Sequence, residues 1–243
     1  MSAYLPFIPI DFTVAHLIAI GLIFALWGLY TPILAIIGKG SLNTQLHAVR
    51  LRWLHMHQSV DRDQRVIDAL MLGHISSSIS YFGSATLIIL AGLIGTLVNI
   101  NRVYIVTREI TFMAPMSADL FALNFTLVTL ILVLCLFAFT YALRKMAYVF
   151  AMLGGLDVAA TPTPEVSMMA DQTARVLTEA VKSINNGIRG FYYAVAALFM
   201  FAGPYASIAA TVLITALLYY RQLYSPTAAA IAKYVEALKR VKE

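Results

Sequence analysis

Charged side chains are scarce in this chain, and four long stretches contain none. Lys, Arg, Asp and Glu together make up 12% of the 243 residues, whereas hydrophobic residues make up 60% and the mean hydropathy is +0.80. The charge-free stretches are residues 12–38, 69–101, 120–143 and 190–220. Each is at least as long as the roughly 20 apolar residues that an α-helix needs to cross a bilayer core. This scarcity of charge excludes an ordinary soluble protein and predicts several membrane-spanning helices.

Cysteine and the sequence motifs of catalysis are equally scarce. The single cysteine, Cys135, lies inside a charge-free stretch, so neither an internal disulfide framework nor a thiolate metal site is available. The sequence has no Gly-rich phosphate loop, nucleophile elbow or paired carboxylate set. We therefore expect no catalytic residues and predict that the protein is not an enzyme.

The histidines do not form a recognisable metal or heme site. His55 and His57 are two positions apart and point to different sides of a helix, while His47 and His55 are separated by more than two turns. No Glu-x-x-His pattern of the kind used in di-iron bundles accompanies them. We expect no metal and no other cofactor, and a membrane enzyme or heme protein is only the third hypothesis for function.

The basic residues are spread over all hydrophilic segments, although the formal net charge is +5. A nucleic-acid-binding protein would concentrate them on one face, so no nucleic acid partner is expected. Basic loops of membrane proteins contact anionic lipid headgroups and set the topology. We expect such headgroups at the cytoplasmic face to be one partner of this chain.

The pattern of apolar and polar segments predicts an all-α, polytopic bundle in one membrane domain, residues 1–243. The predicted spans cover about residues 12–37, 74–98, 119–143 and 191–220, and amphipathic helices are expected at about 42–70 and 164–188. Thr163 and Pro164 have the residue types of a helix N-cap and first turn. The last span is interrupted at Gly203-Pro204, which favours one kinked helix and leaves a helical hairpin as the alternative.

The distribution of Lys and Arg predicts the orientation. Five of these residues lie between the first two spans and five between the third and fourth, whereas the N-terminal segment has none. The positive-inside rule then places both amphipathic helices in the cytoplasm and the N-terminus outside. The side of the C-terminus stays open, because its basic tail conflicts with four crossings.

Small residues recur at close-packing spacing on the predicted spans, which lets helix backbones approach one another. The first span carries Gly21, Ala25, Gly28 and Pro32, and the second carries Ser77, Ser80, Ser84, Ala91 and Gly95. We expect these stripes to pack inside the bundle, with self-association as the alternative. Ser76–Ser84 together with Asn124, the amide well inside the third span, are the alternative candidates for a polar path.

A few polar residues are candidates for structural or gating roles. Arg189 follows Asn186 and precedes Tyr192 at the cytoplasmic mouth of the last span, where a basic residue commonly anchors the helix to the interface. The sharper hypothesis is an ion pair of Arg189 with Asp68 or Asp61. Asp61 and Asp68 are also spaced for helical ion pairs with Arg65. Pro204 completes the candidates as the proline of the break.

Two separated polar motifs resemble one protein family. The first comprises Arg50-x-Arg-Trp53, Arg62-Asp-Gln-Arg65-Val-Ile-Asp68-Ala and Ser80-Tyr-Phe-Gly-Ser84-Ala-Thr-Leu, and the second is Asn186-Gly-x-Arg189-x-x-Tyr192-Tyr-Ala-x-Ala-Ala. They are similar to the domain-of-unknown-function family numbered 599, which contains small multi-pass membrane proteins of bacteria and plants. The resemblance covers roughly residues 15–225. It implies four or so spans and a bacterial inner membrane, and it carries no activity.

These observations favour a non-enzymatic, self-associating membrane protein that scaffolds or accompanies a larger membrane assembly. Its partners would be further copies of itself or other membrane subunits. The alternative is an oligomeric channel or passive transporter whose path follows Ser76–Ser84 and Asn124. The spans have no acidic or basic residue away from their ends, which disfavours proton- or voltage-driven transport.

Overall fold

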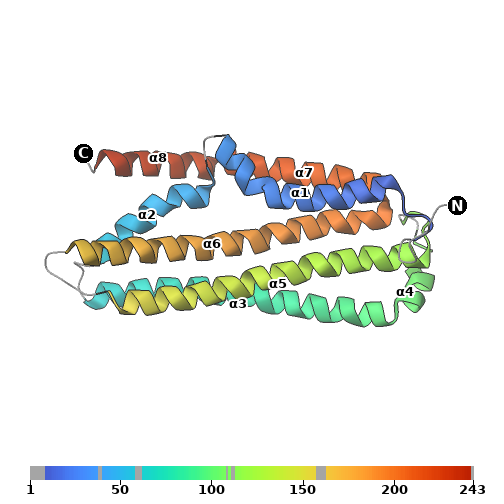
Figure 1. The fold of residues 1–243 in the computed structure, drawn as a ribbon, viewed down its shortest axis with the longest axis horizontal. Helices are drawn as coiled ribbons and strands as arrows, with labels where there is room; N and C mark the ends of the chain where they lie inside the picture. The colour runs from blue at the N-terminus through green and yellow to red at the C-terminus, as the bar shows by residue number, and fades with distance from the viewer. Residues whose placement is uncertain are drawn as a thin grey trace. The chain divides into compact units, whose positions relative to one another are not determined.

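The computed structural model describes residues 9–37, 40–57, 62–107, 109–110, 113–156 and 163–241. In these ranges the regular secondary structure is helical throughout, with no strand, which confirms the all-α prediction (Figure 1). The helices are α1 (Val14–Ile36), α2 (Leu42–His57), α3 (Arg62–Val98), α4 (Ile100–Thr107), α5 (Ala118–Gly154), α6 (Pro164–Leu198), the 3-10 helix η1 (Phe199–Ala202), α7 (Pro204–Leu223) and α8 (Pro226–Arg240).

Four helical segments are long and apolar enough to cross a membrane, as predicted for a polytopic bundle. They are Val14–Ile36, Val66–Val98, Ala118–Gly154 and Pro204–Arg240. The helices α3 and α5 extend well beyond the predicted spans 74–98 and 119–143. The helix expected over 42–70 is divided between α2 and the start of α3, and residues 58–61 between them lie outside the described ranges.

Side-chain caps define where three helices begin. The hydroxyl of Thr163 accepts a hydrogen bond from the Val166 N–H at 3.3 Å, and α6 starts at Pro164, as the sequence predicted. Ser225 caps α8 in the same way, and Ser117 caps α5 by accepting from the Leu120 N–H at 3.1 Å. Each cap satisfies one of the N–H groups that have no partner inside the helix.

The Gly203-Pro204 break produces a helical hairpin in place of the kinked helix that the sequence favoured. The chain reverses because Gly203 adopts a φ of +114°, a backbone conformation that residues with a Cβ rarely adopt. The Ser207 hydroxyl donates to the Ala196 carbonyl at 3.0 Å, which holds α7 antiparallel to the end of α6. The Ala114 N–H donates to the Phe201 carbonyl at 2.9 Å and braces the turn from outside. The Gly-Pro pair alone is compatible with a kinked helix or a hairpin, and these long-range hydrogen bonds stabilise the hairpin.

The chain divides into two compact units, each built from separate stretches of sequence. The first unit comprises Met1–Tyr30, Thr86–Cys135 and Ile188–Leu218. One part of its core is aromatic and surrounds the buried Phe121. The centroid of the Phe121 ring lies 5.5 Å from that of Tyr104, 5.0 Å from that of Phe125 and 5.3 Å from that of Phe201. This cluster joins α4, α5 and η1 at the start of α5.

The second unit comprises Thr31–Ala85, Leu136–Gly187 and Tyr219–Glu243. Its α2 packs against α8. A small apolar core of Leu54, Leu156, Ala170 and Ala174 joins α2 to the end of α5 and the first half of α6. Gly187 approaches α5 so closely that a Cβ at this position would lie 2.7 Å from a ring carbon of Phe139. Phe139 in turn stacks on Phe82 of α3 at 5.7 Å between ring centroids.

The small-residue stripes on the first two spans are not used for packing inside the chain, which corrects our expectation. All four stripe residues of α1 and all five of α3 are exposed. The face that α1 buries instead carries large side chains, including Ile23, Trp27 and Tyr30. Large side chains therefore form the buried face of α1, and the helical glycines at which a Cβ would clash are Gly187 and Gly190 of α6.

Candidate functional site

Arg189 lies on an aromatic ring inside the first unit. Its guanidinium carbon is 4.5 Å from the centroid of the Tyr30 ring, which is a favourable position for a cation–π interaction. The Tyr30 hydroxyl donates to the Leu218 carbonyl at 3.1 Å, and this side chain is only 4% exposed. Arg189 thus sits where α1, α6 and α7 converge. The long sequence separation of Tyr30 from Arg189 explains why no local pattern identified it as a contact.

The next residue, Gly190, brings α6 very close to α1 and α5. A Cβ on Gly190 would lie 2.3 Å from the Cys135 sulfur and 2.7 Å from a ring carbon of Trp27. Trp27 stacks on Tyr193 with 6.3 Å between centroids. We name Trp27, Tyr30, Arg189, Gly190 and Tyr193 the Arg189 cluster.

A buried polar ladder continues from this cluster along α7. The Thr215 hydroxyl donates to the Thr211 carbonyl at 2.7 Å, so the Tyr193 hydroxyl, 3.0 Å from Thr215 Oγ1, is the donor of the bond between them. Ser207, Thr211 and Thr215 are all buried. Each of these hydroxyls is satisfied by a carbonyl, as required in a low-dielectric setting. The ladder stabilises the hairpin and offers no free donor for substrate binding.

Replacing Tyr193 by Phe is expected to lower the free energy of unfolding by about 1 kcal/mol, because one buried hydrogen bond is lost while the ring contacts remain. Thermal unfolding of the detergent-solubilised variant measures this effect. The matched control is Tyr205→Phe, since Tyr205 is 77% exposed and its hydroxyl should contribute almost nothing. Equal melting temperatures for the two variants would show that the Tyr193–Thr215 bond is energetically unimportant.

Asn124 is buried at the other end of the first unit. It is 1% exposed, and its side-chain N–H₂ donates to the Met200 carbonyl at 3.4 Å and to the Met116 sulfur at 3.7 Å. Its side-chain oxygen is buried and has no hydrogen-bond partner among the described residues. Asn124 therefore joins α5 to the hairpin turn.

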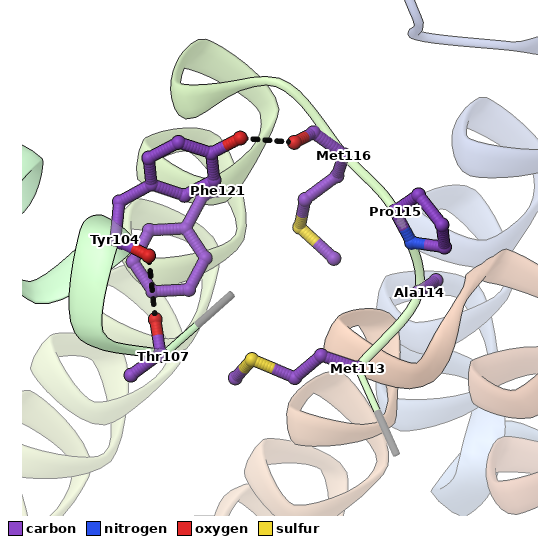
Figure 2. A pocket seen from close by; sticks show the side chains of 7 residues that line it. All are labelled: Tyr104, Thr107, Met113, Ala114, Pro115, Met116 and Phe121. Carbon is purple, nitrogen blue, oxygen red and sulfur yellow. Dashed lines mark hydrogen bonds between the residues drawn. The ribbon is translucent and has the colours of Figure 1, made fainter. Parts of the chain in front are cut away.

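A cavity of about 210 Å³ opens beside Met116, between α4 and the start of α5. Figure 2 shows the rings of Tyr104 and Phe121 and the thioethers of Met113 and Met116 around it. The remaining lining residues are Thr107, Ala114 and Pro115. The Tyr104 hydroxyl donates to the Met116 carbonyl at 2.7 Å and ties the loop to α4. None of the seven described lining residues carries a formal charge, so this part of the cavity suits a small uncharged molecule.

An interaction between Asp11 and Ser117 holds the start of α5. One carboxylate oxygen of Asp11 accepts from the Ser117 N–H at 2.7 Å and the other from its hydroxyl at 2.6 Å. Burial by itself would raise the pKa of Asp11, but the hydrogen bonds from Ser117, together with the backbone N–H of Asp11 and the nearby His16, outweigh it, and the pKa lies below its ordinary value of 3.8. The charged carboxylate is thus favoured by the fold.

This interaction predicts a loss of stability in acid. A carboxylate with a lowered folded-state pKa contributes stability above its unfolded pKa of about 3.9, and the contribution is lost as pH falls through the folded pKa. At pH 6, Asp11→Asn should lower the free energy of unfolding by about 1 kcal/mol, because the amide cannot accept both hydrogen bonds. Thermal unfolding measures this as a lower melting temperature than that of the wild type. The difference should shrink toward pH 3. A constant difference over this pH range would contradict the assignment.

The other candidates from the sequence that the structure describes lie on α3, α6 and α7. Ser80 and Ser84 are exposed on α3, and the Ser80 hydroxyl donates to the carbonyl of Ser76 in its own helix at 3.0 Å. In the second unit, Asp68 is buried, with 3% of its surface exposed, and Asn186 is exposed. In the first unit, Tyr192 is half-buried and Pro204 is the first residue of α7. Asp61 and the side chain of Arg65 lie outside the described part of the chain. The ion pair of Arg189 with Asp68 or Asp61 stays a prediction.

The structure also contains contacts that sequence analysis missed. The α2 residues Asn43, His47 and Arg50 all bind Thr178 of α6, and His55 lies 2.7 Å from the Asp171 carboxylate. The spacing of Asn43, His47 and Arg50 on one helical face was the available signal. Their common acceptor could not be identified, because it lies on a distant helix. Among the side chains that the structure describes, no three of His, Cys, Asp and Glu gather in a way that could hold a metal ion.

Comparison with known proteins gives one result. The model of a family described as "Protein of unknown function, DUF599" matches residues 18–227. No curated protein and no solved structure matches the chain. The matched range includes most of α1, the whole hairpin and both polar motifs.

Proposed function

This chain belongs to the DUF599 family of proteins of unknown function, and we propose that it is a non-enzymatic membrane protein that self-associates and scaffolds or accompanies a larger membrane assembly. The observation that carries the proposal is the exposure of both small-residue stripes. Gly21, Ala25, Gly28 and Pro32 are exposed on α1, as are Ser77, Ser80, Ser84, Ala91 and Gly95 on α3. For Gly21, Gly28 and Gly95, a Cβ would meet no atom within 4 Å.

Of the four candidate spans, α3 has the smallest buried share. Only 11% of its most apolar window is buried, compared with 50% of the corresponding window of α5. A helix face that contacts lipid tails usually carries long apolar side chains. A face of Gly, Ala and Ser instead permits another helix to approach closely and gain dispersion contacts.

A second copy of the chain is the partner that this arrangement favours. Two stripes occur on one chain, so two copies can supply both sides of a close helix–helix contact without another protein. Association through one patch of this kind is typical of symmetric oligomers. Other membrane subunits would be bound through the surfaces that the oligomer leaves free.

The orientation and location form part of this proposal. The positive-inside rule supports an inner-membrane protein with its N-terminus outside and α2 with the first half of α6 in the cytoplasm. In that orientation, basic side chains of α2 and α6 reach the anionic headgroups of the inner leaflet.

Mild-detergent extraction followed by native mass spectrometry tests the proposal, with visible spectra taken on the same sample. We expect a discrete homo-oligomer, alone or with further membrane subunits, and no absorbance from a heme. A strictly monomeric protein that copurifies with nothing would contradict it.

An oligomeric channel is the second candidate, and the exposed serines of α3 are what favour it. Because Ser77, Ser80 and Ser84 lie on the surface of one copy, a polar path along them could form only where copies meet. Flux through proteoliposomes that disappears in Ser80→Leu would support this function. Tight vesicles containing the confirmed oligomer would count against it and leave the scaffold.

A further inference from the structure

Three side chains of α2 converge on one hydroxyl in the second unit. Arg50 Nη1 donates to Thr178 Oγ1 at 3.2 Å, His47 Nδ1 lies 2.9 Å from the same oxygen, and Asn43 Nδ2 donates to the Thr178 carbonyl at 3.2 Å. Arg50 Nη1 also donates to the Asn43 carbonyl at 3.2 Å. The two helices are thus fastened through Thr178, and the cluster is half-buried.

The hydrogen-bond directions leave donors pointing away from Thr178. The Thr178 hydroxyl accepts from Arg50 and can either donate to His47 Nδ1 or accept from it, depending on the tautomer of His47. In the tautomer that accepts from Thr178, and in protonated His47, the Nε2–H is a donor that points away from Thr178. Both hydrogen bonds that Arg50 forms with described residues use Nη1, so Nε and Nη2 keep their N–H groups for another partner.

Positive charge exceeds negative charge around this cluster. No carboxylate described in the structure forms an ion pair with Arg50, and burial lowers the pKa of its guanidinium, which nevertheless stays protonated. Next to Thr178, the Glu179 carboxylate is shared by Lys145 at 3.8 Å and Lys182 at 3.4 Å. Among the described side chains, the two lysines thus share one acid, and Arg50 contacts only neutral oxygens. A half-buried arginine that contacts only neutral oxygens is costly without an anion.

We propose that Arg50, His47 and Lys182 form a binding site for a phosphate group, presented by an anionic lipid headgroup or by free phosphate. The planar guanidinium fits two phosphate oxygens at once. A bound anion would favour His47 with its proton on Nε2, which then supplies a further donor. Lys182 lies on α6 one turn after Thr178, on the same face of that helix. Lys182 is half-exposed, and its ion pair with Glu179, 3.4 Å long at the surface, would open for the ammonium to turn toward a bound anion. The site is independent of self-association and remains if the chain is monomeric.

Binding to the full-length protein tests the site with two probes. Inorganic phosphate is titrated calorimetrically into detergent-solubilised protein, and phosphatidic acid is offered in phosphatidylcholine nanodiscs, with pure phosphatidylcholine nanodiscs as the blank. Arg50→Gln is expected to weaken binding of the effective probe about tenfold or more, since charge-assisted hydrogen bonds are lost. Lys182→Gln should weaken it about threefold, as expected for a more exposed charge.

The matched control is Arg52→Gln, which removes the same charge from the same helix and should leave affinity within about twofold of wild type. Binding of phosphate alone would identify a soluble ligand, and binding of phosphatidic acid alone would identify a lipid; either supports the site. Failure of both probes, or equal losses in Arg50→Gln and Arg52→Gln, overturns it. If Arg50→Gln does not fold, Lys182→Gln against Arg52→Gln decides the question.

Discussion

Gly190→Ala is expected to destabilise the folded protein by about 3 kcal/mol, a large effect for the addition of one methyl group. The new Cβ would lie 2.3 Å from the Cys135 sulfur and 2.7 Å from a ring carbon of Trp27. Neither neighbour can yield easily: Cys135 is fully buried and Trp27 is only 7% exposed. Relief would require α6 to move away from α1 and α5, at the point where Arg189 rests on Tyr30. The melting temperature of the detergent-solubilised protein measures the loss.

The control for this prediction is Gly92→Ala on α3. A Cβ there would meet no atom within 4 Å, and alanine is the better helix former by about 1 kcal/mol. This variant should be as stable as the wild type or slightly more so. Identical behaviour of the two alanine variants would mean that α6 does not approach α1 and α5 as closely as the structure has it.

A compensating substitution makes the cause identifiable. Cys135→Ala removes the sulfur nearest to the new methyl group and should cost little alone, because only one small atom is lost from the core. Combined with Gly190→Ala, it should restore part of the lost stability, since the remaining close contact is with the edge of the Trp27 ring. Simple additivity of the two changes would show that these residues do not interact.

The first three membrane spans were predictable because hydropathy is a local property, whereas the predicted span 191–220 is divided between α6 and α7. A helix in lipid must satisfy its own backbone, so a charge-free run of sufficient length has few alternatives to a spanning helix. The same reasoning applies to the α6 start, where Thr163 and Pro164 act within one turn. Helix ends beyond the spans, such as the continuation of α5 to Gly154, depend on packing in the second unit and were missed.

Features that depend on long-range contacts were less predictable. The Gly203-Pro204 pair indicates a break, but the choice of a hairpin rests on bonds such as that between Ser207 and the Ala196 carbonyl. Arg189 stood out as a charge at the mouth of a span, whereas its contact with Tyr30 required the fold. The stripes on α1 and α3 had the right spacing for close packing. Spacing alone does not say whether the neighbour is the same chain or another.

The largest effect on assembly is expected from Ser80→Leu, which should weaken self-association at least about tenfold, equivalent to roughly 1.4 kcal/mol. Ser80 lies exposed within the α3 stripe, and its hydroxyl is already bonded to the Ser76 carbonyl. The substitution therefore leaves no buried group unsatisfied in the single chain. It adds bulk where a second helix would have to approach, and so prevents the close contact. Energy transfer between labelled copies, measured in liposomes at decreasing protein-to-lipid ratio, reports the change in association.

Ser78→Leu is the matched control, because it makes the same chemical change on a different face of the same helix. Ser78 is also exposed, and its hydroxyl donates to the His74 carbonyl at 2.9 Å, as Ser80 does to Ser76. At about 100° per residue, the two serines point roughly 160° apart around α3. A stripe-mediated interface predicts that Ser78→Leu associates like the wild type. Equal weakening by both variants would mean that α3 responds to hydrophobicity in general, and undiminished association in Ser80→Leu would place the interface elsewhere on the chain.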